Sequence, residues 1–167
     1  AWMRILPSAG WMAWIEDEAQ AIVWTGSAWI PVVDAMGFIA QAASVAVARE
    51  ANGATTGMAV LEETLTGLSG ASGDSTIVIP NRAIVLGVSV RTVTAVLGAS
   101  SFDCGVSGEP SKFGGSLGVA VGSSNIGVIG PTAFYADTPV RLTANGGNFA
   151  GGAVRIAIHY LTCGAPG

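Results

Sequence analysis

The stretch AIVLGVSVRTVTAVL, residues 83–97, indicates the fold of this chain more clearly than any other segment. Its β-branched residues recur with a period of two, as in a strand that buries one face and exposes the other. The predicted apolar face carries Ile84, Leu86, Val88, Val90 and Val96. The opposite face carries Gly87, Ser89 and Arg91. We therefore predict a long, half-buried β-strand.

The same pattern returns in AVRIAIHYL, residues 153–161. One face of this second strand carries Val154, Ile156, Ile158 and Tyr160, and the other carries Arg155, Ala157 and His159. Turn signals such as Pro80-Asn81 and Gly130-Pro131 separate further short strands. About eight strands are expected between residues 76 and 163. The sequence thus predicts a mainly β protein whose C-terminal domain, residues 57–167, is a jelly-roll-like β-sandwich.

A tryptophan-rich segment lies near the start of the chain. Four of the five tryptophans fall between Trp11 and Trp29, beside the turn signals PSAG (residues 7–10) and TGS (residues 25–27). We predict two short β-hairpins over residues 1–31. Because two-stranded ribbons are marginal in water, these hairpins are expected to pack on another chain or on sequence that precedes Ala1.

An alanine-rich segment, residues 32–51, is predicted to be a helix. Apolar residues recur along it at spacings of three and four, at Val33, Met36, Ala40, Ala43 and Val47. This spacing is typical of a coiled-coil seam, so residues 32–56 are interpreted as a helical stalk and linker, with an ordinary packed helix as the alternative. A homotrimer is expected, although an alanine-rich seam does not separate a trimer from a dimer.

Composition and charge exclude several functions. The 167 residues include 24 glycines, and the net charge is −4. Residues 1–74 carry eight acids against two bases, and residues 75–167 carry three acids against five bases. No region is basic enough to indicate nucleic-acid binding. The longest apolar uncharged helical stretch, residues 35–48, is shorter than the roughly 20 residues of a membrane span, so no membrane insertion is expected.

The start of the chain and its two cysteines give only weak indications of domain organisation and of compartment. Ala1 opens within what looks like a motif, so we expect a C-terminal piece of a longer protein. Cys104 and Cys163 match no metal or redox spacing. Two buried free thiols are expected, with a disulfide between strands, formed in an oxidising compartment, as the alternative.

The residues of this sequence give little indication of a catalytic site. The single histidine, His159, sits in the middle of a strand, and no Gly-x-Ser-x-Gly motif accompanies it, so a structural or interface role is expected. A glycosidase needs two carboxylates across a cleft, whereas Asp103, Glu109 and Asp137 resemble turn-forming loop acids. The acidic run at residues 16–18 lacks the alternating ligands of a calcium loop. We expect no enzyme, no cofactor and no metal site.

Carbohydrate binding fits the residues better. A pyranose packs its apolar face on an exposed aromatic ring while polar neighbours bind its hydroxyls. Tyr135 is the preferred ring, ahead of Phe134, because its hydroxyl suits a half-wet position. Asp137, Asn125 and Lys112 are its predicted polar neighbours. A core position for the aromatic residues is the alternative.

Basic side chains are expected on outward strand faces, at Arg91, Arg141 and Arg155, with Arg82 and Lys112 near strand ends. Arginine binds carboxylates through two parallel hydrogen bonds, so adjacent arginines would suit an acidic polysaccharide. Arg91 is therefore included in the predicted carbohydrate site. The alternative is that these bases pair with acids across a subunit interface or face water singly.

Several motifs resemble a known family. They are PSAGWMAWIEDE (residues 7–18), WTGSAW (24–29), IPNRAIVLGVSVR (79–91), FGG (113–115), GPTAFYAD (130–137), LTA (142–144) and HYL (159–161). They resemble the C-terminal part of an uncharacterised family of alphaproteobacterial prophages and gene transfer agents, whose members serve as particle spikes or fibres. The resemblance implies a trimeric spike that docks to a cell-surface glycan, with capsular polysaccharide as the expected ligand. It supplies no catalytic motif.

The sequence therefore predicts a non-enzymatic spike or fibre protein on the surface of a virion or phage-like particle, extracellular after release. Its expected partners are a cell-surface polysaccharide, two further copies of itself and other head or tail proteins. The first alternative is a purely structural trimeric fibre or anchoring module. The second is a polysaccharide depolymerase whose carboxylates come from different subunits.

Overall fold

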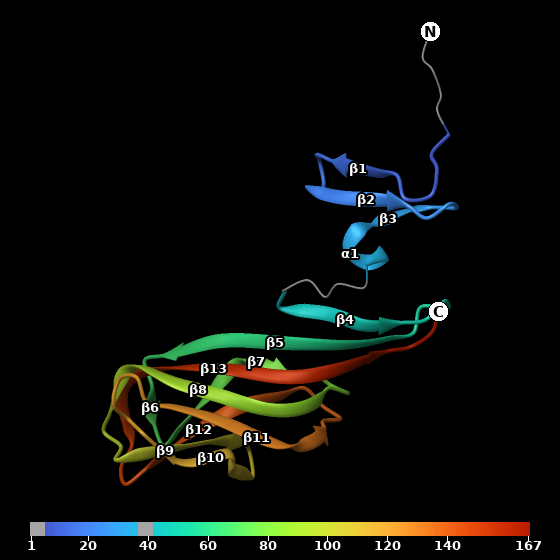
Figure 1. The fold of residues 1–167 in the computed structure, drawn as a ribbon. Helices are drawn as coiled ribbons and strands as arrows, with labels where there is room; N and C mark the ends of the chain where they lie inside the picture. The colour runs from blue at the N-terminus through green and yellow to red at the C-terminus, as the bar shows by residue number, and fades with distance from the viewer. Residues whose placement is uncertain (1–5, 37–41) are drawn as a thin grey trace. The chain divides into compact units, whose positions relative to one another are not determined.

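The computed structural model of the chain describes residues 6–36 and 42–167 (Figure 1). The chain divides into two compact units, Ala1–Ala42 and Ala43–Gly167. This division falls inside the predicted stalk of residues 32–56. Each unit is taken in turn.

The first unit holds a three-stranded antiparallel sheet followed by one helical turn. Its strands are β1 (Met12–Ile15), β2 (Gln20–Trp24) and β3 (Trp29–Pro31), and its helix is α1 (Val32–Ala35). Trp24 and Trp29 are paired across β2 and β3, with tilted rings 5.6 Å apart. None of the described residues of this unit is buried. The sheet therefore has no core of its own within the described residues.

The predicted helix over residues 32–51 is wrong for most of its described length. Helix α1 ends at Ala35, and residues 44–49 form strand β4, while Ala40 lies outside the described residues. Val45 and Val47 alternate with alanines, a period-two pattern that is also compatible with a strand. Pairing with the neighbouring strand β5 then supplies the backbone hydrogen bonds that a helix would have made.

The second unit is a β-sandwich. Its strands are β4 (Ser44–Arg49), β5 (Thr55–Thr66), β6 (Ser69–Gly70), β7 (Ser72–Ile79), β8 (Ile84–Leu97), β9 (Ser101–Val106), β10 (Glu109–Leu117), β11 (Ser124–Ala133), β12 (Thr138–Asn145) and β13 (Phe149–Gly164). One sheet has the order β10-β9-β12-β7, and the other has the order β11-β8-β13-β5-β4, with β6 paired to β13. Figure 1 shows β5, β13 and β8 side by side.

Eight of these strands are nested in antiparallel pairs, the first with the last. β5 pairs with β13, β7 with β12, β8 with β11, and β9 with β10. Successive pairs alternate between the two sheets, as when one long hairpin is rolled up. This is the connectivity of a jelly roll. The predicted fold class, a mainly β chain with a jelly-roll-like sandwich, is confirmed.

Strand β13 lies in the middle of its sheet and matches the predicted alternation. Its inward residues Val154, Ile156 and Ile158 are fully buried, and Tyr160 is nearly so. They pack against side chains of the facing sheet, among them Phe102, Cys104, Val140 and Leu142. The outward residues include Arg155 and His159.

Strand β8 departs from the prediction in its first half. Val85 is fully buried, whereas Ile84 and Leu86 are only partly buried. The register explains the difference, because His159 pairs with Gly87 and Tyr160 pairs with Val85, which leaves Leu86 as an extra residue. Such a β-bulge reverses the faces of the residues before it. The predicted face is therefore correct from Val88 onward and wrong for Ile84 and Leu86.

The cysteines also differ from expectation. Both are free, but only Cys104 is buried, while Cys163 is exposed near the end of β13. Cys104 lies in β9, in the opposite sheet from Cys163. The prediction of two buried thiols is thus wrong for Cys163, because β13 runs past the edge of the core there.

Candidate functional site

Two loops at one end of the sandwich are joined by backbone hydrogen bonds. The turn between β7 and β8, residues 80–83, meets the β11–β12 connection, residues 134–137. The amide N of Arg82 donates to the carbonyl oxygen of Phe134 over 2.7 Å, and the amide N of Phe134 donates to the carbonyl oxygen of Ala83 over 3.0 Å. The Asp137 Oδ1 accepts from the amide N of Asn81 over 2.8 Å. These bonds hold both loops in one geometry.

The local sequence explains why Tyr135 points outward. Phe134 is half-buried and packs on the core, so its neighbour Tyr135 is directed away from the core. Tyr135 has 82% of its surface exposed, the largest fraction among the exposed large hydrophobic residues. In the facing turn, Arg82 has φ 67°, a left-handed conformation that closes the turn tightly.

We call Asn81, Arg82, Tyr135 and Asp137 the Tyr135 platform. It combines an exposed ring, a guanidinium, an amide and a carboxylate, all on exposed residues of two pinned loops. An exposed ring on joined loops that also carry hydrogen-bonding groups of both kinds is suited to sugar binding. The sequence analysis identified Tyr135 and Asp137 but did not place Asn81 and Arg82 with them. Arg82 was named only as one of several basic side chains near strand ends, and the sequence signal for Asn81 was the turn that begins at Pro80.

The other three predicted site residues lie elsewhere on the sandwich. Asn125 is on β11, next to Ser124, which pairs with Arg91. The Nδ2 of Asn125 donates to the carbonyl oxygen of Phe113 over 3.0 Å. Lys112 is on the edge strand β10, with its Nζ 3.0 Å from Glu109. Arg91 is exposed on β8. The end of β8 that lies near the Tyr135 loop is at Ile84, which pairs with Ala133, and Arg91 is seven positions further along the strand. The structure thus brings Tyr135 and Asp137 together and separates them from these three.

Three of the six basic side chains in the described residues, Lys112, Arg141 and Arg155, form ion pairs. Arg141 binds Asp74 through two hydrogen bonds, of 2.6 and 2.7 Å. That hydrogen bonding lowers the pKa of Asp74 and raises the pKa of Arg141. Arg155 lies 3.7 Å from Glu62. Within residues 6–36 and 42–167, Arg82 and Arg91 form no ion pair, so Arg82 is a cation free to bind a ligand at the Tyr135 platform.

The carboxylates considered for hydrolysis are engaged separately. Asp103 Oδ1 accepts from the amide N of Ser116 over 2.7 Å and from Nδ2 of Asn145 over 2.6 Å, which ties β9 to its two neighbours. Glu109 pairs with Lys112. Asp137 holds the turn at Asn81. These three acids share no hydrogen-bond partner in the described structure, and each has a structural role.

His159 projects from the outer face of β13, where its Nε2 lies 3.0 Å from the Ser89 Oγ. No group of three or more His, Cys, Asp or Glu side chains in the described residues is arranged to hold a metal ion.

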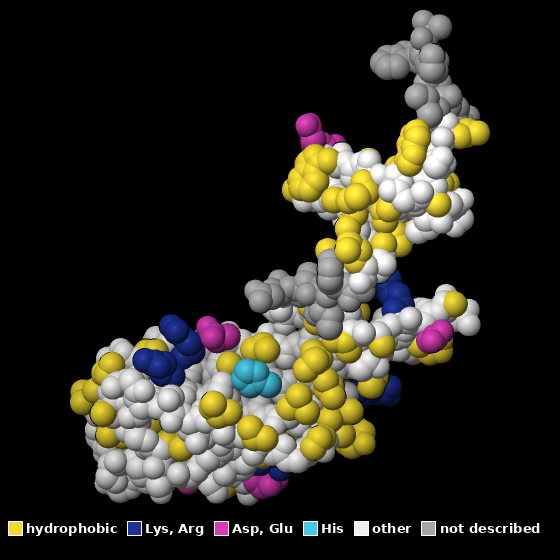
Figure 2. All heavy atoms as spheres, in the orientation of Figure 1, with side chains coloured by type: hydrophobic (Ala, Val, Ile, Leu, Met, Phe, Trp, Pro, Cys, Tyr) yellow, Lys and Arg dark blue, Asp and Glu magenta, His cyan; other side chains and the backbone are white. Residues whose placement is uncertain are grey.

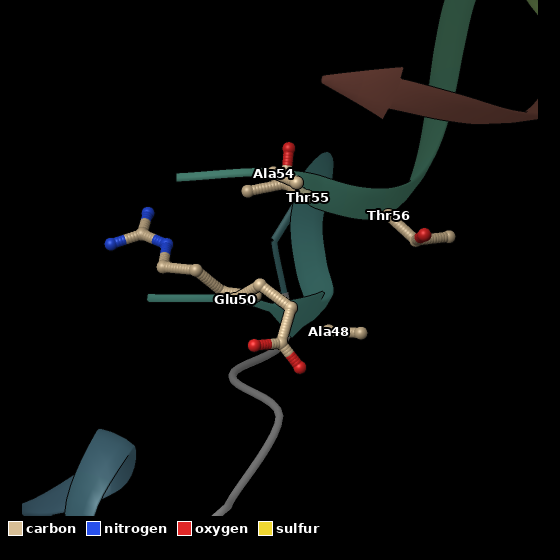
Figure 3. Close-up of a pocket in the computed structure, with 6 residues that line it drawn as sticks. Ala48, Glu50, Ala54, Thr55 and Thr56 are labelled. Atoms are coloured by element: carbon tan, nitrogen blue, oxygen red, sulfur yellow. The ribbon is translucent and has the colours of Figure 1, made fainter. Parts of the chain in front are cut away.

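A depression at the end of β4 and the start of β5 is a poor candidate for a ligand site. It is lined by residues 48–50 and 54–56 (Figure 3). The side chains of Glu50 and Thr56 point in different directions, so no polar groups converge. A second depression, beside β5 and β7, contains Glu63, whose Oε2 accepts from the amide N atoms of Thr76 and Ile77. Its carboxylate therefore joins the two sheets.

Comparisons with known proteins found a distant structural likeness. No family model and no curated protein matches the chain. A solved structure, the cyanophage Pam1 capsid asymmetric unit, is similar over 70% of this chain and 91% of that chain, with 19% identity and a TM-score of 0.43. Within the part of the chain that the structure describes, no helix has the length and apolarity needed to cross a membrane.

Proposed function

We propose that this protein is a surface spike or fibre component of a phage-like particle and that it attaches the particle to a cell by binding an acidic polysaccharide. The ligand would be a capsular polysaccharide, and the binding site would be the Tyr135 platform. Binding is taken to be non-catalytic. A homotrimer that joins other head or tail proteins, as in gene transfer agents, is part of the proposal.

The observation that carries the proposal is the exposure of Tyr135 on a fixed loop. A ring with 82% of its surface in water leaves its apolar face open for a pyranose to pack on. The hydrogen bonds at Arg82, Phe134 and Asp137 hold the loop before any ligand arrives. A preorganised site loses less entropy on binding, so a weakly interacting sugar gains affinity there.

The charge of the site favours an acidic ligand. Arg82 can bind a uronate carboxylate through two parallel hydrogen bonds, while Asn81 and Asp137 can bind hydroxyls. Because the guanidinium is exposed, its contribution should weaken as salt rises. The particle context rests on the motifs in residues 7–29 and 79–161 that resemble prophage and gene-transfer-agent proteins.

The test is calorimetric titration of the purified chain with host capsular polysaccharide, with polymer length measured before and after. We expect binding, unchanged polymer length, and a loss of about tenfold or more in affinity for Tyr135→Ala, which removes the stacking ring. Trp14→Ala is the matched control, since Trp14 is another exposed aromatic residue but lies on β1, in the first unit. Its affinity should equal that of the wild type.

Two arginine variants then show which arginine side chain contributes to binding the polysaccharide. Arg82→Ala should weaken binding and reduce its salt dependence, whereas Arg91→Ala should do so only if the site extends along β8. Binding that survives Tyr135→Ala and Arg82→Ala would overturn the assignment of the site. Absence of any binding would favour the purely structural fibre, and shortening of the polymer would favour a depolymerase.

A further inference from the structure

Two arginine side chains lie directly opposite each other on neighbouring strands. Arg91 of β8 is the register partner of Arg155 of β13, and the two residues are exposed. Their neighbours along the strands, among them Val90, Val154 and Ile156, are buried, so both arginines project from the outer face of the sheet. Figure 2 shows Lys and Arg side chains gathered on the face that also shows the chain's histidine. Residues in such a pair have Cβ atoms about 5 Å apart.

Hydroxyl side chains extend this pair into a row across four strands. Ser124 of β11 pairs with Arg91, and Thr64 of β5 pairs with Arg155. The Nε of Arg155 donates to the Oγ1 of Thr64 over 3.2 Å. Cross-strand partners project to the same side of a sheet, so the four residues form one transverse line of hydrogen-bond donors. We call Ser124, Arg91, Arg155 and Thr64 the arginine row.

The arginine row carries more positive charge than its surroundings neutralise. Within the described residues Arg91 forms no ion pair, and the one acidic contact of Arg155 is to Glu62, whose Oε1 lies 3.7 Å from its Nε. By comparison, Arg141 and Lys112 lie 2.6 and 3.0 Å from their acids. Like charges directly opposite each other destabilise a sheet. The row therefore keeps a net positive charge and a repulsion that no described acid removes.

An oxyanion is the ligand that this arrangement favours. A guanidinium presents parallel N–H donors that match two oxygens of a carboxylate or sulfate group. Thr64 uses only the Nε of Arg155, and within residues 6–36 and 42–167 the side chain of Arg91 donates no hydrogen bond. The terminal nitrogens of both arginines are thus available on the same face. An anion bound between them would also remove their mutual repulsion.

The pairing of Arg91 with Arg155 distinguishes them from the third arginine that was expected on an outward strand face. Arg141 lies on β12, in the other sheet, and its guanidinium is bound to both carboxylate oxygens of Asp74. Of the three, the structure brings Arg91 and Arg155 together.

The arginine row is separate from the Tyr135 platform. Arg91 lies seven positions along β8 from Ile84, which pairs with Ala133 at the start of the Tyr135 loop. Seven residues of a strand span about 23 Å. An oxyanion bound at the row therefore does not reach the platform.

We propose that the arginine row is a binding site for an oxyanion of the carboxylate or sulfate class. A free anion and an acidic group on a polysaccharide present the same oxygens to the row, so the test includes both. The inference does not rest on the proposed function, because it requires neither Tyr135 nor a polymer. If the anion is carried on a polysaccharide, the row is a second contact that strengthens attachment through effective concentration.

The test is an NMR titration of the full chain with sodium sulfate, referenced to sodium chloride at equal, low ionic strength, because salt screens exposed charges. We expect the backbone amide signals of Arg91, Arg155 and Ser124 to shift saturably with sulfate. Arg91→Gln and Arg155→Gln should each raise the dissociation constant about fivefold. Glu62→Gln should lower it, because the change removes the acid that competes for Arg155.

Arg49→Gln is the matched control. Arg49 is an exposed arginine on β4 of the same sheet, but its register partner is Thr55 and no arginine lies opposite it. This variant has the same net charge as Arg91→Gln, and its dissociation constant for sulfate should equal that of the wild type. Circular dichroism confirms that each variant is folded.

A second titration distinguishes the two sources of the anion. It uses a short oligogalacturonate and its uncharged methyl ester. Tighter binding of the oligogalacturonate than of sulfate, weakened by Arg91→Gln and absent with the ester, would support the site and assign it to a polysaccharide. Binding of sulfate without tighter binding of the oligogalacturonate would support the site and assign it to a free anion.

The outcome is independent of the Tyr135 platform. Tyr135→Ala should leave sulfate binding at the arginine row unchanged, so loss of the proposed glycan site and loss of this site are separate results. Amide shifts with sulfate no larger than those with chloride would overturn the inference. Sulfate binding that Arg91→Gln and Arg155→Gln leave unchanged would overturn it as well.

Discussion

Single acidic side chains join strands in this sandwich. Glu63 accepts hydrogen bonds from two amides of β7, and Asp103 accepts one from β10 and one from β12. The sequence analysis interpreted Asp103 as a turn-forming loop acid, because the residue type does not show which distant backbone amides it binds. The partners of Glu63 and Asp103 lie 13 to 42 positions away in the chain. Only the fold shows that their oxygens are already used.

The two cysteines should react very differently. Burial raises the pKa of the Cys104 thiol to about 12, whereas Cys163 is exposed. Since the thiolate is the nucleophile, iodoacetamide at pH 8 should label Cys163 in the folded protein and Cys104 only after unfolding. Mass spectrometry of the labelled peptides measures this. Labelling of both at equal rates without denaturant would contradict the described core.

The same shift predicts a dependence of stability on pH. The folded state raises the pKa of Cys104 above its ordinary value of 9.0, so the contribution is complete below pH 9 and is lost as pH rises toward 12. The free energy of unfolding, from urea titrations, should therefore fall over that range. The fall should be smaller in Cys104→Ala, while Cys163→Ser should behave like the wild type.

At the scale of elements, the period-two pattern predicts strands well, but it does not predict their irregularities. The faces of β13 follow the alternation of its residues from Val154 to Tyr160. In β8 the bulge at Leu86 reverses the faces of the residues before it. Residues 44–49 show the converse problem, since alanines fit helix and strand alike and the neighbouring strand β5 decides the outcome.

Two glycines of β11 should differ sharply in their tolerance of alanine. A Cβ on Gly127 would lie 1.9 Å from the carbonyl oxygen of Phe113, because β10 passes close to it, whereas a Cβ on Gly130 would meet nothing within 4 Å. Gly127→Ala should lower the free energy of unfolding by about 3 kcal/mol. Gly130→Ala, on the same strand, should change it by less than about 1 kcal/mol.

Urea denaturation of both variants measures the difference. Equal stability of the two would mean that β10 and β11 do not approach each other at Phe113. If Gly127→Ala does not fold at all while Gly130→Ala folds normally, the result also agrees with the prediction, because the loss of stability is then larger than expected.

At the scale of the whole molecule, the two units differ in how much they bury. The sandwich has a continuous core from both sheets, whereas no described residue of the first unit is buried. A fragment of residues 43–167 should therefore unfold cooperatively at a temperature within a few degrees of the full chain's main transition. A peptide of residues 1–42 should show no cooperative transition, because small sheets without a core are marginal.

Scanning calorimetry and circular dichroism of the two pieces test this. A cooperative transition in the peptide would show that the first unit is stable by itself. Loss of the transition in the fragment would show that the sandwich needs the first unit.

The proposed binding function also depends on the whole molecule, because the surfaces it uses form only when the strands of the jelly roll come together. The Tyr135 platform unites two loops more than 50 positions apart. The outer face of the sheet that holds β13 likewise collects exposed aliphatic side chains from distant strands, Met58 and Val60 from β5 and Ile126 and Val128 from β11. Neither surface is continuous in the sequence.

The sequence by itself determined the class of the fold and the face of β13 that is buried, and it left a core position for Tyr135 open. These properties depend on residue type and on the spacing of near neighbours, which the chain displays directly. The tertiary structure alone decided that β4 is a strand, that Leu86 sits in a bulge, that Arg82 belongs beside Tyr135 and that one outer face exposes aliphatic side chains. These depend on strands distant in the chain, and the register of their pairing is fixed only when the whole jelly roll has closed.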